Sequence, residues 1–517
     1  MHLLPSSLIS EVDRYAENTL GISQIELMKR SAEGVLGVIK SKLPRGGKVV
    51  ILAGPGNNGG DGYALAKLLS GSYIPKVFDV LGKGQRSEAG KFYLDTCIES
   101  GIAVEEYSGD TRQREEITKA DCIVDAVFGT GVRGELPEKI IGLCDAIGQA
   151  KGSFKIAVDV PLGVNPDTGE ALPCTPRFDA TVELSFPKVG VVSYPAKEYT
   201  GELFYCNIGL PTKKIAEIFP SGFTLTDRAW AKDVLPERPR NSNKGSFGKL
   251  LIIAGSEGYP GAPILSVEAA LRGGVGYVCF LGEEWQNREM LFHFPEVIYK
   301  KRAAFEALTD ADIKEAVALA QNYTAVLIGP GAGRSVGLAS LVRAFIESSG
   351  APLVLDADAV SSLSRQPLGA EALLANAKRN VIITPHPGEF ATITGKRIAE
   401  IQGRRIPEAR SFAEKTGVTL VLKGAGTLIA DRESLYINST GSPALSKAGS
   451  GDCLAGLIAA LVASGMPSIQ ASALGVYIHG AAGDSLEGEL SSLGVTPSDL
   501  PLRMARIIAE LEKEKKM

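Results

Sequence analysis

Residues 249–272 read KLLIIAGSEGYPGAPILSVEAALR, and residues 48–70 read KVVILAGPGNNGGDGYALAKLLS. In each stretch a short apolar run is followed by a glycine-rich turn and then by apolar residues at helical spacing. This succession is typical of the strand–turn–helix unit that opens a parallel α/β sheet. Because about 200 residues separate the two stretches, we predict two domains of the same α/β class, each starting its own sheet.

The length of the chain supports this division, because 517 residues are more than one hydrophobic core accommodates. Between the two stretches, residues 211–248 carry prolines at 211, 220, 236 and 239 among mixed charges, which is typical of a connector. We therefore predict an N-terminal domain over residues 1–217, a connector over 218–240 and a C-terminal domain over 241–517.

Further apolar runs predict the remaining elements. A helix is expected over about residues 8–39, where apolar residues recur at helical spacing. Residues 453–483 contain no Asp, Glu, Lys or Arg, but Gly465, Pro467 and Gln470 interrupt them, so two buried helices are expected there instead of a membrane span. Strands are expected at 122–129, 155–160, 181–186, 326–331, 353–358, 381–386 and 419–424, and ligands bind at the carboxyl ends of such strands.

The composition excludes some classes of partner. A net charge of −4 gives no broad basic surface, so no nucleic acid is expected as a partner. No membrane association is expected either. The seven cysteines show no CxxC pair or zinc spacing and fit a reducing compartment. Since charged residues interrupt the first residues before any long apolar run, no signal peptide is expected, and we predict a cytoplasmic location.

The first glycine-rich loop is a candidate ligand site. GPGNNG (54–59) fits the GxGxxG pattern between a strand and a helix, which favours dinucleotide binding. The more distinctive part is NNGGDG (57–62), where Asn57, Asn58 and Asp61 offer oxygen atoms in a tight bend. The alternative is a Gly/Asn turn in which Asp61 only caps the helix.

A second loop, KAGSGDCLAGLIAAL (447–461), places Asp452 where a glycine-rich turn runs into an apolar helix. A helix N-terminus binds anions such as phosphate. A carboxylate beside a phosphate acts well as a base that takes a proton from a hydroxyl. The alternative is that Asp452 is an ordinary N-cap, and this stretch alone does not separate the two interpretations.

Four motifs of the N-terminal domain together resemble the NAD(P)H-hydrate epimerase family: AGPGNNGGDG (53–62), DAVFGTGVRG (125–134), VDVPLG (158–163) and FPKVG (186–190). The resemblance spans most of residues 8–210 and implies a Rossmann-like three-layer sandwich. It implies that the nucleotide is held by two loops and by one acid: Asn57, Asn58, Gly59, Gly60 and Asp61; Gly129, Thr130, Gly131, Val132, Arg133, Gly134 and Glu135; and Asp159.

The same resemblance implies a potassium site and a catalytic pair. The potassium ligands match Asn58, Asp125 and position 162, where this chain has Leu162 in place of the serine of the family. Asp159 resembles the acid that contacts the substrate, and Lys188 is similarly placed in FPKVG. A carboxylate and an ammonium group suit epimerisation at a carbon that bears a hydroxyl. The alternative for Lys188 is a solvated loop lysine.

Six motifs of the C-terminal domain resemble the ADP- or ATP-dependent NAD(P)H-hydrate dehydratase family, which has a ribokinase-like three-layer fold. They are the stretch 241–266, GPGAG (329–333), DADAV (356–360), TPHPGEF (384–390), LKGAGT (422–427) and GSGD (449–452). The resemblance implies that Asp452 is the catalytic acid/base. It implies that Ala262, Gly331 and His386 contact the hydrated dinucleotide. The adenine nucleotide is assigned to Lys423, Gly424, Ala425, Gly426 and Thr427, and to Ser442, Pro443, Ala444, Leu445, Ser446, Lys447, Ala448, Gly449, Ser450 and Gly451.

Taken alone, Lys423 fits a surface lysine as well as a phosphate contact, and His386 fits a histidine that is satisfied within its own turn. Together the resemblances predict a bifunctional repair enzyme. It would interconvert the R and S hydrates of NADH and NADPH (NADHX and NADPHX) and dehydrate the S form. We expect ADP as the phosphoryl donor, with ATP as the alternative, Mg²⁺ held in part by Glu389, and K⁺. The family also implies a homo-oligomer.

Two other functions are open at this stage. GSGD and LKGAGT alone fit a small-molecule kinase of the ribokinase-like class fused to a nucleotide-binding domain. Both glycine-rich loops also fit a nucleotide sensor that binds its ligand without turnover. The repair enzyme and the kinase each predict a chemical product, whereas the sensor predicts none.

Overall fold

The computed structural model describes residues 1–82, 86–130 and 137–517. The chain divides into two compact units: the N-terminal unit is His2–Phe223, and the C-terminal unit is Thr224–Met517 together with Met1. This division falls inside the segment 218–240 that the sequence predicts as a connector. The later part of that segment contributes a strand and a helix to the C-terminal unit: β8 (Phe223–Thr226) and α8 (Arg228–Val234).

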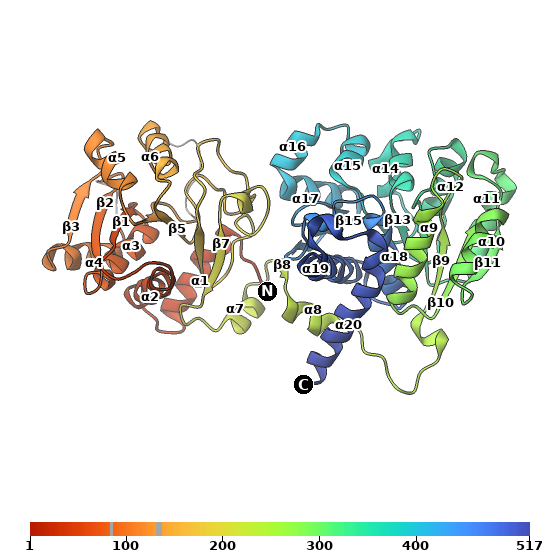
Figure 1. The fold of residues 1–517 in the computed structure, drawn as a ribbon, viewed down its shortest axis with the longest axis horizontal. Coiled ribbons are helices and arrows are strands. Elements are labelled where there is room, and N and C mark those ends of the chain that lie inside the picture. Colours follow the sequence, from red (N-terminus) through yellow and green to blue (C-terminus); the bar gives the residue numbers. More distant parts are fainter. Residues whose placement is uncertain (83–85, 131–136) are drawn as a thin grey trace. The chain divides into compact units, whose positions relative to one another are not determined.

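The described residues of the N-terminal unit form a seven-stranded sheet in the order β3-β2-β1-β4-β5-β6-β7 (Figure 1). Every neighbouring pair in it is parallel. The reversal of strand order between β1 and β4 is the switch point of a Rossmann-like sheet, where such folds bind ligands. The strands are β1 (Lys48–Ala53), β2 (Ile74–Asp79), β3 (Ala103–Glu106), β4 (Cys122–Ala126), β5 (Phe154–Val158), β6 (Ala180–Leu184) and β7 (Glu202–Cys206).

Helices cover both faces of this sheet, because alternate residues of its strands are buried on opposite sides. Val49 and Ile51 of β1 pack in the cluster with helices α2 to α4, whereas Val50 and Leu52 pack with α5 and α6. The result is the predicted three-layer sandwich. The helices are α1 (Ser6–Asn18), α2 (Gln24–Lys42), α3 (Asn57–Leu69), α4 (Glu88–Glu99), α5 (Thr111–Thr118), α6 (Glu138–Gln149) and α7 (Thr212–Ile218), with a 3₁₀ turn, η1 (Ala196–Glu198).

The prediction of one helix over residues 8–39 is wrong. The segment forms two helices, α1 and α2, because Gly21 adopts a left-handed conformation with φ +68° and Ser23 then caps α2 by accepting from the N–H of Glu26. Both features are ordinary stop and start signals. The break turns the side chains of two separate helices toward one pocket.

The C-terminal unit contains a ten-stranded sheet in the order β11-β10-β9-β12-β13-β14-β15-β16-β17-β8 among the residues described. The pairs from β11 to β15 are parallel, as predicted, and β15-β16-β17 are antiparallel. The strands after β8 are β9 (Lys249–Ile253), β10 (Tyr277–Gly282), β11 (Ile298–Lys301), β12 (Ala325–Ile328), β13 (Leu353–Leu355), β14 (Val381–Ile383), β15 (Thr419–Leu422), β16 (Leu428–Ala430) and β17 (Leu435–Asn438).

Both faces of this sheet are covered as well. Leu250 and Ile252 of β9 pack in one cluster with α9, α18, α19 and α20, and Leu251 and Ile253 on the other face are fully buried. The helices after α8 are α9 (Gly261–Arg272), α10 (Glu284–His293), α11 (Asp310–Ala320), α12 (Val336–Glu347), α13 (Asp358–Ser362), α14 (Ala370–Ala375), α15 (Pro387–Thr394), α16 (Ile398–Gly403), α17 (Arg405–Thr416), α18 (Ser450–Ala463), α19 (Ser468–Gly494) and α20 (Leu500–Lys516). The 3₁₀ turns are η2 (Lys244–Phe247), η3 (Phe305–Ala307), η4 (Leu363–Arg365), η5 (Pro443–Leu445) and η6 (Pro497–Asp499).

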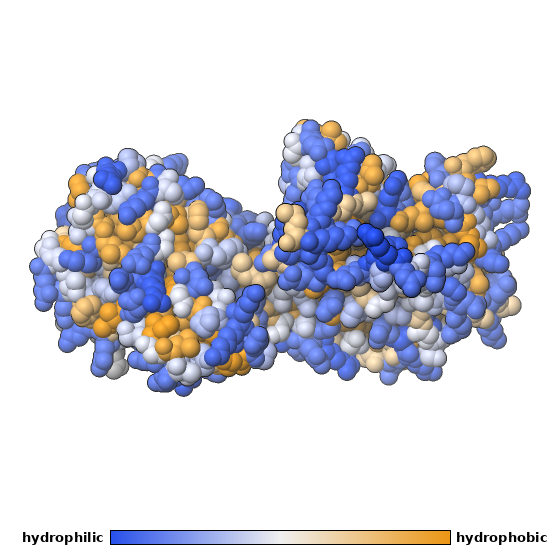
Figure 2. Space-filling model, turned by 90° about the horizontal axis from the view of Figure 1, so that it is seen from below, coloured by the Kyte–Doolittle hydropathy of each residue, from blue (hydrophilic) through white to orange (hydrophobic). Residues whose placement is uncertain are grey.

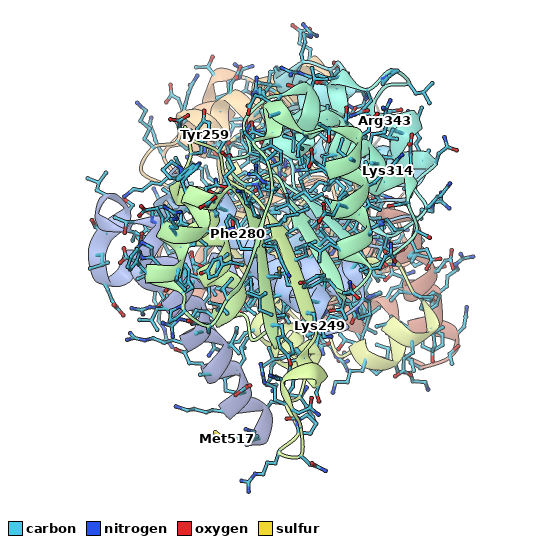
Figure 3. The ribbon with its side chains drawn as sticks, turned by 90° about the vertical axis from the view of Figure 1, so that its right-hand side faces the viewer. Lys249, Tyr259, Phe280, Lys314, Arg343 and Met517 are labelled. Carbon is cyan, nitrogen blue, oxygen red and sulfur yellow. The ribbon has the colours of Figure 1, made fainter. Side chains whose placement is uncertain are left out.

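The direction of the strands defines the edge at which ligands are expected. Figure 3 shows Lys249, the first residue of β9, toward one end of the sheet and Tyr259, which follows that strand, toward the other, with Phe280 of β10 between them. The glycine-rich loop after β9 therefore lies at the carboxyl ends of the parallel strands, where open α/β sheets bind their ligands.

The uncharged stretch 453–483 forms most of α18 and the first half of α19, joined by a turn, as predicted. Its side chains belong to the core of the C-terminal unit. Within the described part of the chain, no helix combines the length and the apolar character that a membrane span requires. The face in Figure 2 carries hydrophilic residues mixed with smaller apolar patches on each unit.

The contact between α9 and α18 tests this packing. A Cβ atom added at Gly456 would lie 2.1 Å from the carbonyl oxygen of Ser266, so Gly456→Ala must push the two helices apart. We expect a loss of about 1–3 kcal/mol in the free energy of unfolding, measured as a lower melting temperature of the C-terminal unit.

Gly488→Ala in α19 is the matched control, because an added Cβ there has no atom within 4 Å. Alanine has the higher helix propensity, so this variant is expected to be neutral or more stable by up to about 1 kcal/mol. Equal melting temperatures for both variants would contradict the close contact of α9 and α18.

Candidate active sites

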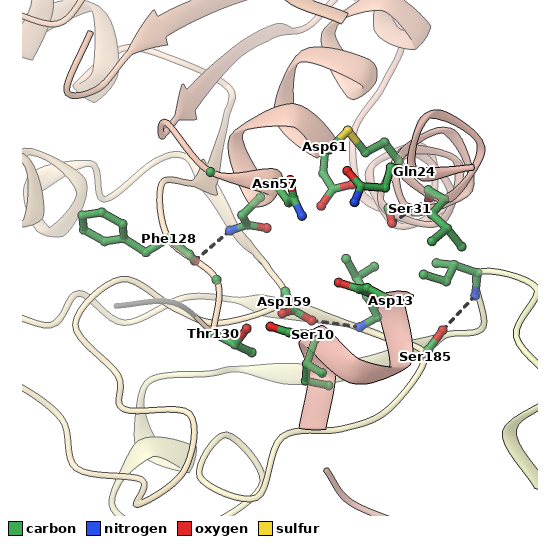
Figure 4. Close-up of a pocket in the computed structure, with 18 of the residues that line it drawn as sticks. Ser10, Asp13, Gln24, Ser31, Asn57, Asp61, Phe128, Thr130, Asp159 and Ser185 are labelled. Carbon is green, nitrogen blue, oxygen red and sulfur yellow. Dashed lines mark hydrogen bonds between the residues drawn. The ribbon is translucent and has the colours of Figure 1, made fainter. Parts of the chain in front are cut away.

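The N-terminal unit has a pocket of about 620 Å³ at the carboxyl ends of β1, β4, β5 and β6. The start of α3, the turn after β4 and the first two helices close around it (Figure 4). The predicted residues of both nucleotide loops that the structure describes line this pocket or adjoin it. Polar residues that line it are Ser10, Asp13, Gln24, Ser31, Asn57, Asn58, Asp61, Thr130, Asp159, Ser185 and Lys188.

The glycine-rich loop is built for close approach of main chains. A Cβ atom at Gly59 would lie 1.8 Å from the carbonyl oxygen of Gly54, and one at Gly54 would lie 1.8 Å from that of Val127. Only glycine fits these two positions. Asp61 does not cap α3, because the cap residue is Gly56 and it makes no side-chain cap bond, so the capping alternative for Asp61 is wrong.

Lys188 is buried with two carboxylates. Its Nζ donates to Asp159 Oδ1 and lies 3.5 Å from Glu183 Oε2, and the whole residue is 1% exposed. Burial lowers the pKa of Lys188, but the charges of Asp159 and Glu183 outweigh burial and raise it. The alternative of a solvated loop lysine is therefore wrong. Asp159 follows β5 with φ +68°, a rare conformation for a residue other than glycine that is typical of functional sites.

Two further carboxyl groups face the same pocket. Asp61, which is 8% exposed, and Asp13 of α1 point into it together with Asp159 (Figure 4). Burial and the negative charge of Asp159 raise the pKa of Asp61, and they raise the pKa of Asp13 to about 6. No motif in the sequence marks Asp13, which lines the pocket from α1 while its neighbour Val12 is buried in an apolar cluster.

The predicted potassium ligands fit the ion in part. Asn58 donates through Nδ2 to the carbonyl oxygens of Phe128 (2.7 Å) and Val158 (3.0 Å). Its buried Oδ1 has no hydrogen bond within the part of the chain that the structure describes. Asp125 is fully buried and accepts from the N–H groups of Val127 (3.1 Å) and Leu162 (2.7 Å). Burial raises the pKa of Asp125 to about 7.

The side chain of Leu162 offers no oxygen and packs in the apolar cluster beneath the sheet. Only a main-chain group of this residue can face a cation. In the second nucleotide loop, a Cβ atom at Gly129 would lie 3.5 Å from Asn58 Cβ and 3.8 Å from Asp159 Oδ2. The predictions at Gly131, Val132, Arg133, Gly134 and Glu135 lie outside the described residues.

In the C-terminal unit, Asp452 stands in the first turn of α18. The cap residue of this helix is Gly449, with φ +101° and no side-chain cap bond, so the N-cap alternative for Asp452 is wrong. Its carboxylate is therefore not used to cap α18. Burial first, and then the charge of Asp356, raise the pKa of Asp452 to about 7, while Lys423 opposes them. A base with a pKa near neutrality is well matched to proton transfer.

Lys423 lies next to this turn and is held by two carboxylates. Its Nζ is 2.9 Å from Asp356 Oδ1 and 3.9 Å from Glu389 Oε2, and a Cβ atom at Gly451 would lie 3.4 Å from it. The pKa of Lys423 is raised, because these carboxylates outweigh its burial. Burial raises the pKa of Glu389 to about 7. Lys423 is thus a site residue at the start of α18 and is not a free surface lysine.

Asp356 is a residue whose role sequence reasoning missed, although DADAV contains it. It is 1% exposed and accepts from the hydroxyl of Thr384 at 2.5 Å as well as from Lys423. The next residue, Ala357, has φ +50°, which costs an alanine of the order of 1–3 kcal/mol. Such strain at the carboxyl end of β13 marks a position where geometry matters more than stability.

The loop after Lys423 is fixed from behind by Arg405 of α17. Its guanidinium donates to the carbonyl oxygen of Leu422 (3.1 Å) and to Gln402 Oε1 (2.8 Å). Arg405 as a whole is 3% exposed. Gly424 and Gly426 have positive φ, and the hydroxyl of Thr427 donates to the carbonyl oxygen of Gly424 at 2.9 Å. Residues 423–427 therefore form a tight, preformed turn.

The structure brings together two of the three residues predicted to contact the dinucleotide. A Cβ atom at Gly331 would lie 2.7 Å from the Cβ of Ala262. His386 lies after β14, where its Nδ1 accepts from the N–H groups of Gly388 (3.0 Å) and Glu389 (3.2 Å). The cap occupies Nδ1, and the other nitrogen of this half-exposed ring, Nε2, lies 3.5 Å from Glu389 Oε1.

Two side chains of the run from Ser442 to Gly451 make contacts within the protein. Lys447 donates through Nζ to the carbonyl oxygens of Leu493 (2.7 Å) and Val495, and Ser450 is buried against His479, with 3.1 Å between Oγ and Nε2. These two side chains hold the loop in place. The main chain around Gly449 and Gly451 remains for an adenine nucleotide.

These two polar sites, each at the carboxyl ends of a parallel sheet, define a two-domain α/β enzyme. Residues 24–190 match the family model described as YjeF-related protein N-terminus, and residues 250–506 match the model described as NAD(P)H-hydrate dehydratase. The C-terminal unit therefore has the predicted ribokinase-like fold.

Relatives match almost the whole chain. The bifunctional NAD(P)H-hydrate repair enzyme Nnr of Thermofilum pendens is 32% identical over 98% of this chain and 96% of its own length. That of Escherichia coli is 32% identical over 96% and 92%. The chain therefore belongs to the family of bifunctional NAD(P)H-hydrate repair enzymes. The chain is also similar to a solved structure, the ADP/ATP-dependent NAD(P)H-hydrate dehydratase from Bacillus subtilis co-crystallized with ATP/Mg²⁺. The identity is 30% and the TM-score 0.49, and the match covers 56% of this chain and 99% of that chain.

The raised pKa of Asp452 predicts a variant that is more stable than the wild type. The folded enzyme binds the Asp452 proton more tightly (pKa about 7) than the unfolded chain does (3.8), so wild-type stability falls as pH rises between these values and is then constant. Asp452→Asn removes this loss. We expect a gain of the order of 2 kcal/mol at pH 8 and a smaller gain at pH 5, measured as melting temperatures at both values.

Glu296→Gln, which changes an exposed acid of the same unit, is the control and should give no pH-dependent gain. A lower melting temperature of Asp452→Asn at pH 8 would contradict the view that burial opposes the charge of Asp452.

Proposed function

We propose that this enzyme repairs NADHX and NADPHX in two steps, with one step in each unit. The N-terminal pocket would interconvert the R and S hydrates, and the C-terminal site would dehydrate the S hydrate. The observation that carries the proposal is the position of Asp452, in the first turn of α18 and next to Lys423. This position places the base at the N-terminus of α18, and helix N-termini bind phosphate.

In the dehydration step, Asp452 would take the proton from the C6 hydroxyl of the S hydrate. The oxygen would then attack the terminal phosphoryl group of the nucleotide, and the bond from this group to the bridging oxygen would break. The hydroxyl thereby becomes a phosphate ester, and AMP leaves when ADP is the donor, or ADP when ATP is. Loss of this phosphate with a proton from C5 restores the double bond of the nicotinamide ring. The N–H groups at the start of α18 and the ammonium group of Lys423 would stabilise the charge that develops on the phosphate.

We further propose ADP as the donor, with ATP as the alternative, bound along residues 423–427 and 442–451. Mg²⁺ bound with the nucleotide would neutralise phosphate charge. Glu389 fits an indirect, water-mediated contact to the ion, because Glu389 Oε2 already accepts from the N–H of His386 at 2.8 Å. Ala262, Gly331 and His386 would contact the dinucleotide.

In the N-terminal pocket, Asp159 would act on the C6 centre of the R hydrate. The ion pair with Lys188 fixes the position of the Asp159 carboxylate in the pocket, where it can accept a proton. K⁺ would be held by Asn58 Oδ1 and the carboxylate of Asp125, with only main-chain atoms available at Leu162. When bound, the ion would neutralise the buried charge of Asp125.

One assay separates the repair function from the two alternatives. Pure S hydrate is mixed with the enzyme and ADP, then with ATP, and the absorbance band of the reduced nicotinamide is followed. Recovery of the band supports the proposal, and the faster nucleotide identifies the donor. A phosphorylated vitamin precursor or sugar without recovery would indicate a kinase. Nucleotide-dependent stabilisation without any turnover would indicate a sensor.

The two active sites predict a reciprocal pair of variants. Asp452→Asn should lower dehydration of the S hydrate by about 100-fold or more while keeping nucleotide affinity and epimerisation. Asp159→Asn should abolish epimerisation of pure R hydrate and leave dehydration of the S hydrate intact. Both rates are measured by chromatography of R, S and repaired cofactor. Wild-type dehydration by Asp452→Asn, or wild-type epimerisation by Asp159→Asn, would overturn the respective assignment.

The potassium proposal predicts an ion-specific gain in stability. Because a bound ligand stabilises the folded state, the N-terminal unit should melt at a higher temperature in potassium chloride than in choline chloride of equal ionic strength. Asp125→Asn should lose this difference. Equal melting temperatures of the wild type in both salts would contradict the proposed site.

A further inference from the structure

The N-terminal pocket contains a further carboxyl group, that of Asp13, which has no role in the epimerisation by Asp159 proposed above. Val12 and Ala16 of α1 are buried in an apolar cluster with Leu27 and Phe186. Since neighbouring residues of a helix point about 100° apart, this packing turns Asp13 away from the cluster and into the pocket. There it joins Asp61 from α3 and Asp159 from the end of β5 (Figure 4).

The environments of Asp13 and Asp159 differ in charge. Asp159 is held in an ion pair by Lys188, whereas no cation among the described residues pairs with Asp13. Burial and the nearby charge of Asp159 raise the pKa of Asp13 to about 6, although Lys188 opposes them. A carboxyl group with a raised pKa beside a carboxylate held in an ion pair is a usual arrangement of an acid and a base in one active site.

An independent observation marks the pocket as a ligand site. Asn58, which is 7% exposed, lines the pocket, and its Oδ1 has no hydrogen-bond partner among the described residues. A buried oxygen of this kind is costly unless something binds to it. Asp61 is a weaker candidate for the acid than Asp13, because it is more deeply buried and lies within the loop assigned to the nucleotide.

We propose that Asp13 is the proton donor of the epimerase reaction, acting in partnership with Asp159 as the proton acceptor. The inference rests on the proposed function, because it assigns a second catalytic residue to the same site. It also specifies the course of the reaction, since an acid and a base at one hydroxyl-bearing carbon imply loss and return of water.

In the proposed reaction, water leaves C6 from one side of the ring and returns from the other. The C6 hydroxyl takes the proton of Asp13, the C6–O bond breaks, and water leaves. The lone pair of the adjacent ring nitrogen forms a C=N bond, which gives a flat cation. Water then adds to C6 from the opposite side, and its extra proton passes to Asp159. Solvent returns one proton to Asp13 and removes one from Asp159, so the net change is inversion at C6.

The charge of the pocket suits this intermediate. The Asp159 carboxylate lies in its ion pair with Lys188, and burial raises the pKa of Glu183, which lies 3.5 Å from the same ammonium group, to about 8. Once Asp13 has given up its proton, a further negative charge faces the cation. Fixed charges aimed at the place where charge develops are an effective way to lower a barrier.

The decisive variant is Asp13→Asn, which removes the acid and keeps the shape. The full-length enzyme is given pure R hydrate without nucleotide, and formation of the S hydrate is followed by chromatography after subtraction of the uncatalysed rate. We expect kcat to fall by about 100-fold or more. Glu11→Gln, which changes an exposed acid of the same helix, is the matched control and should keep the wild-type rate.

Dehydration of the S hydrate by the same Asp13→Asn sample checks that the chain is folded, together with its melting temperature. If Asp13→Asn does not fold, Asp13→Glu serves instead, and it should retain a measurable pH-dependent rate. Failure of the wild type to interconvert the hydrates would count against the proposed function itself. A wild-type rate in Asp13→Asn, with an active wild-type enzyme, would overturn only the role of Asp13.

A pH profile separates a proton donor from a merely structural residue. The groups that face Asp13 are Asp159, Lys188 and Asp61. Because the protonated form is the active one, wild-type kcat/KM should fall tenfold per pH unit above about pH 6. The residual activity of Asp13→Asn should lack this decline. A slow variant with the wild-type profile would overturn the proposal.

Discussion

In each unit one largely enclosed lysine lies between two carboxyl groups, and this arrangement determines the chemistry of both sites. Lys188 lies with Asp159 and Glu183, and Lys423 lies with Asp356 and Glu389. Burying a charge is costly unless a partner of opposite charge is fixed beside it. Each lysine therefore fixes the carboxylates around it, and the strands that carry them must end at the same edge of the sheet.

The parallel sheets satisfy this requirement, because their strands all end at one edge, where the polar residues that follow them meet. The excess of carboxylates over lysines at each edge has a consequence for proton transfer. Burial raises the pKa of several of these carboxyl groups, including Glu389 beside Lys423 and Glu183 beside Lys188. Burial and neighbouring negative charge raise the pKa of Asp13 to about 6 and of Asp452 to about 7. Both sites thus pair a fixed ionised group with a group poised for proton transfer, although the two reactions differ.

Much of the fold and part of the site could be predicted from the sequence. The parallel strands and the helix pair within 453–483 were found because their apolar runs are continuous and bounded by turn residues. Asp452, Lys423, Asp159 and Lys188 stand in recognisable motifs. The break between α1 and α2 was missed, because Gly21 is weak evidence beside a strong helical pattern. Asp13 was missed with it, since an acid on a helix carries no signal of its own.

The sequence by itself determined the two α/β units and the loops that carry their chemistry, because hydrophobic periodicity and glycine-rich turns are local properties of the chain. The tertiary structure alone decided which alternative holds at each candidate residue. It excluded Asp452 and Asp61 as helix caps and buried Lys188 between carboxylates. It also engaged the side chains of Lys447 and Ser450 with residues of α19 and the segment after it. Burial, ion pairing and pKa depend on residues far apart in the chain, so no local pattern could have settled them.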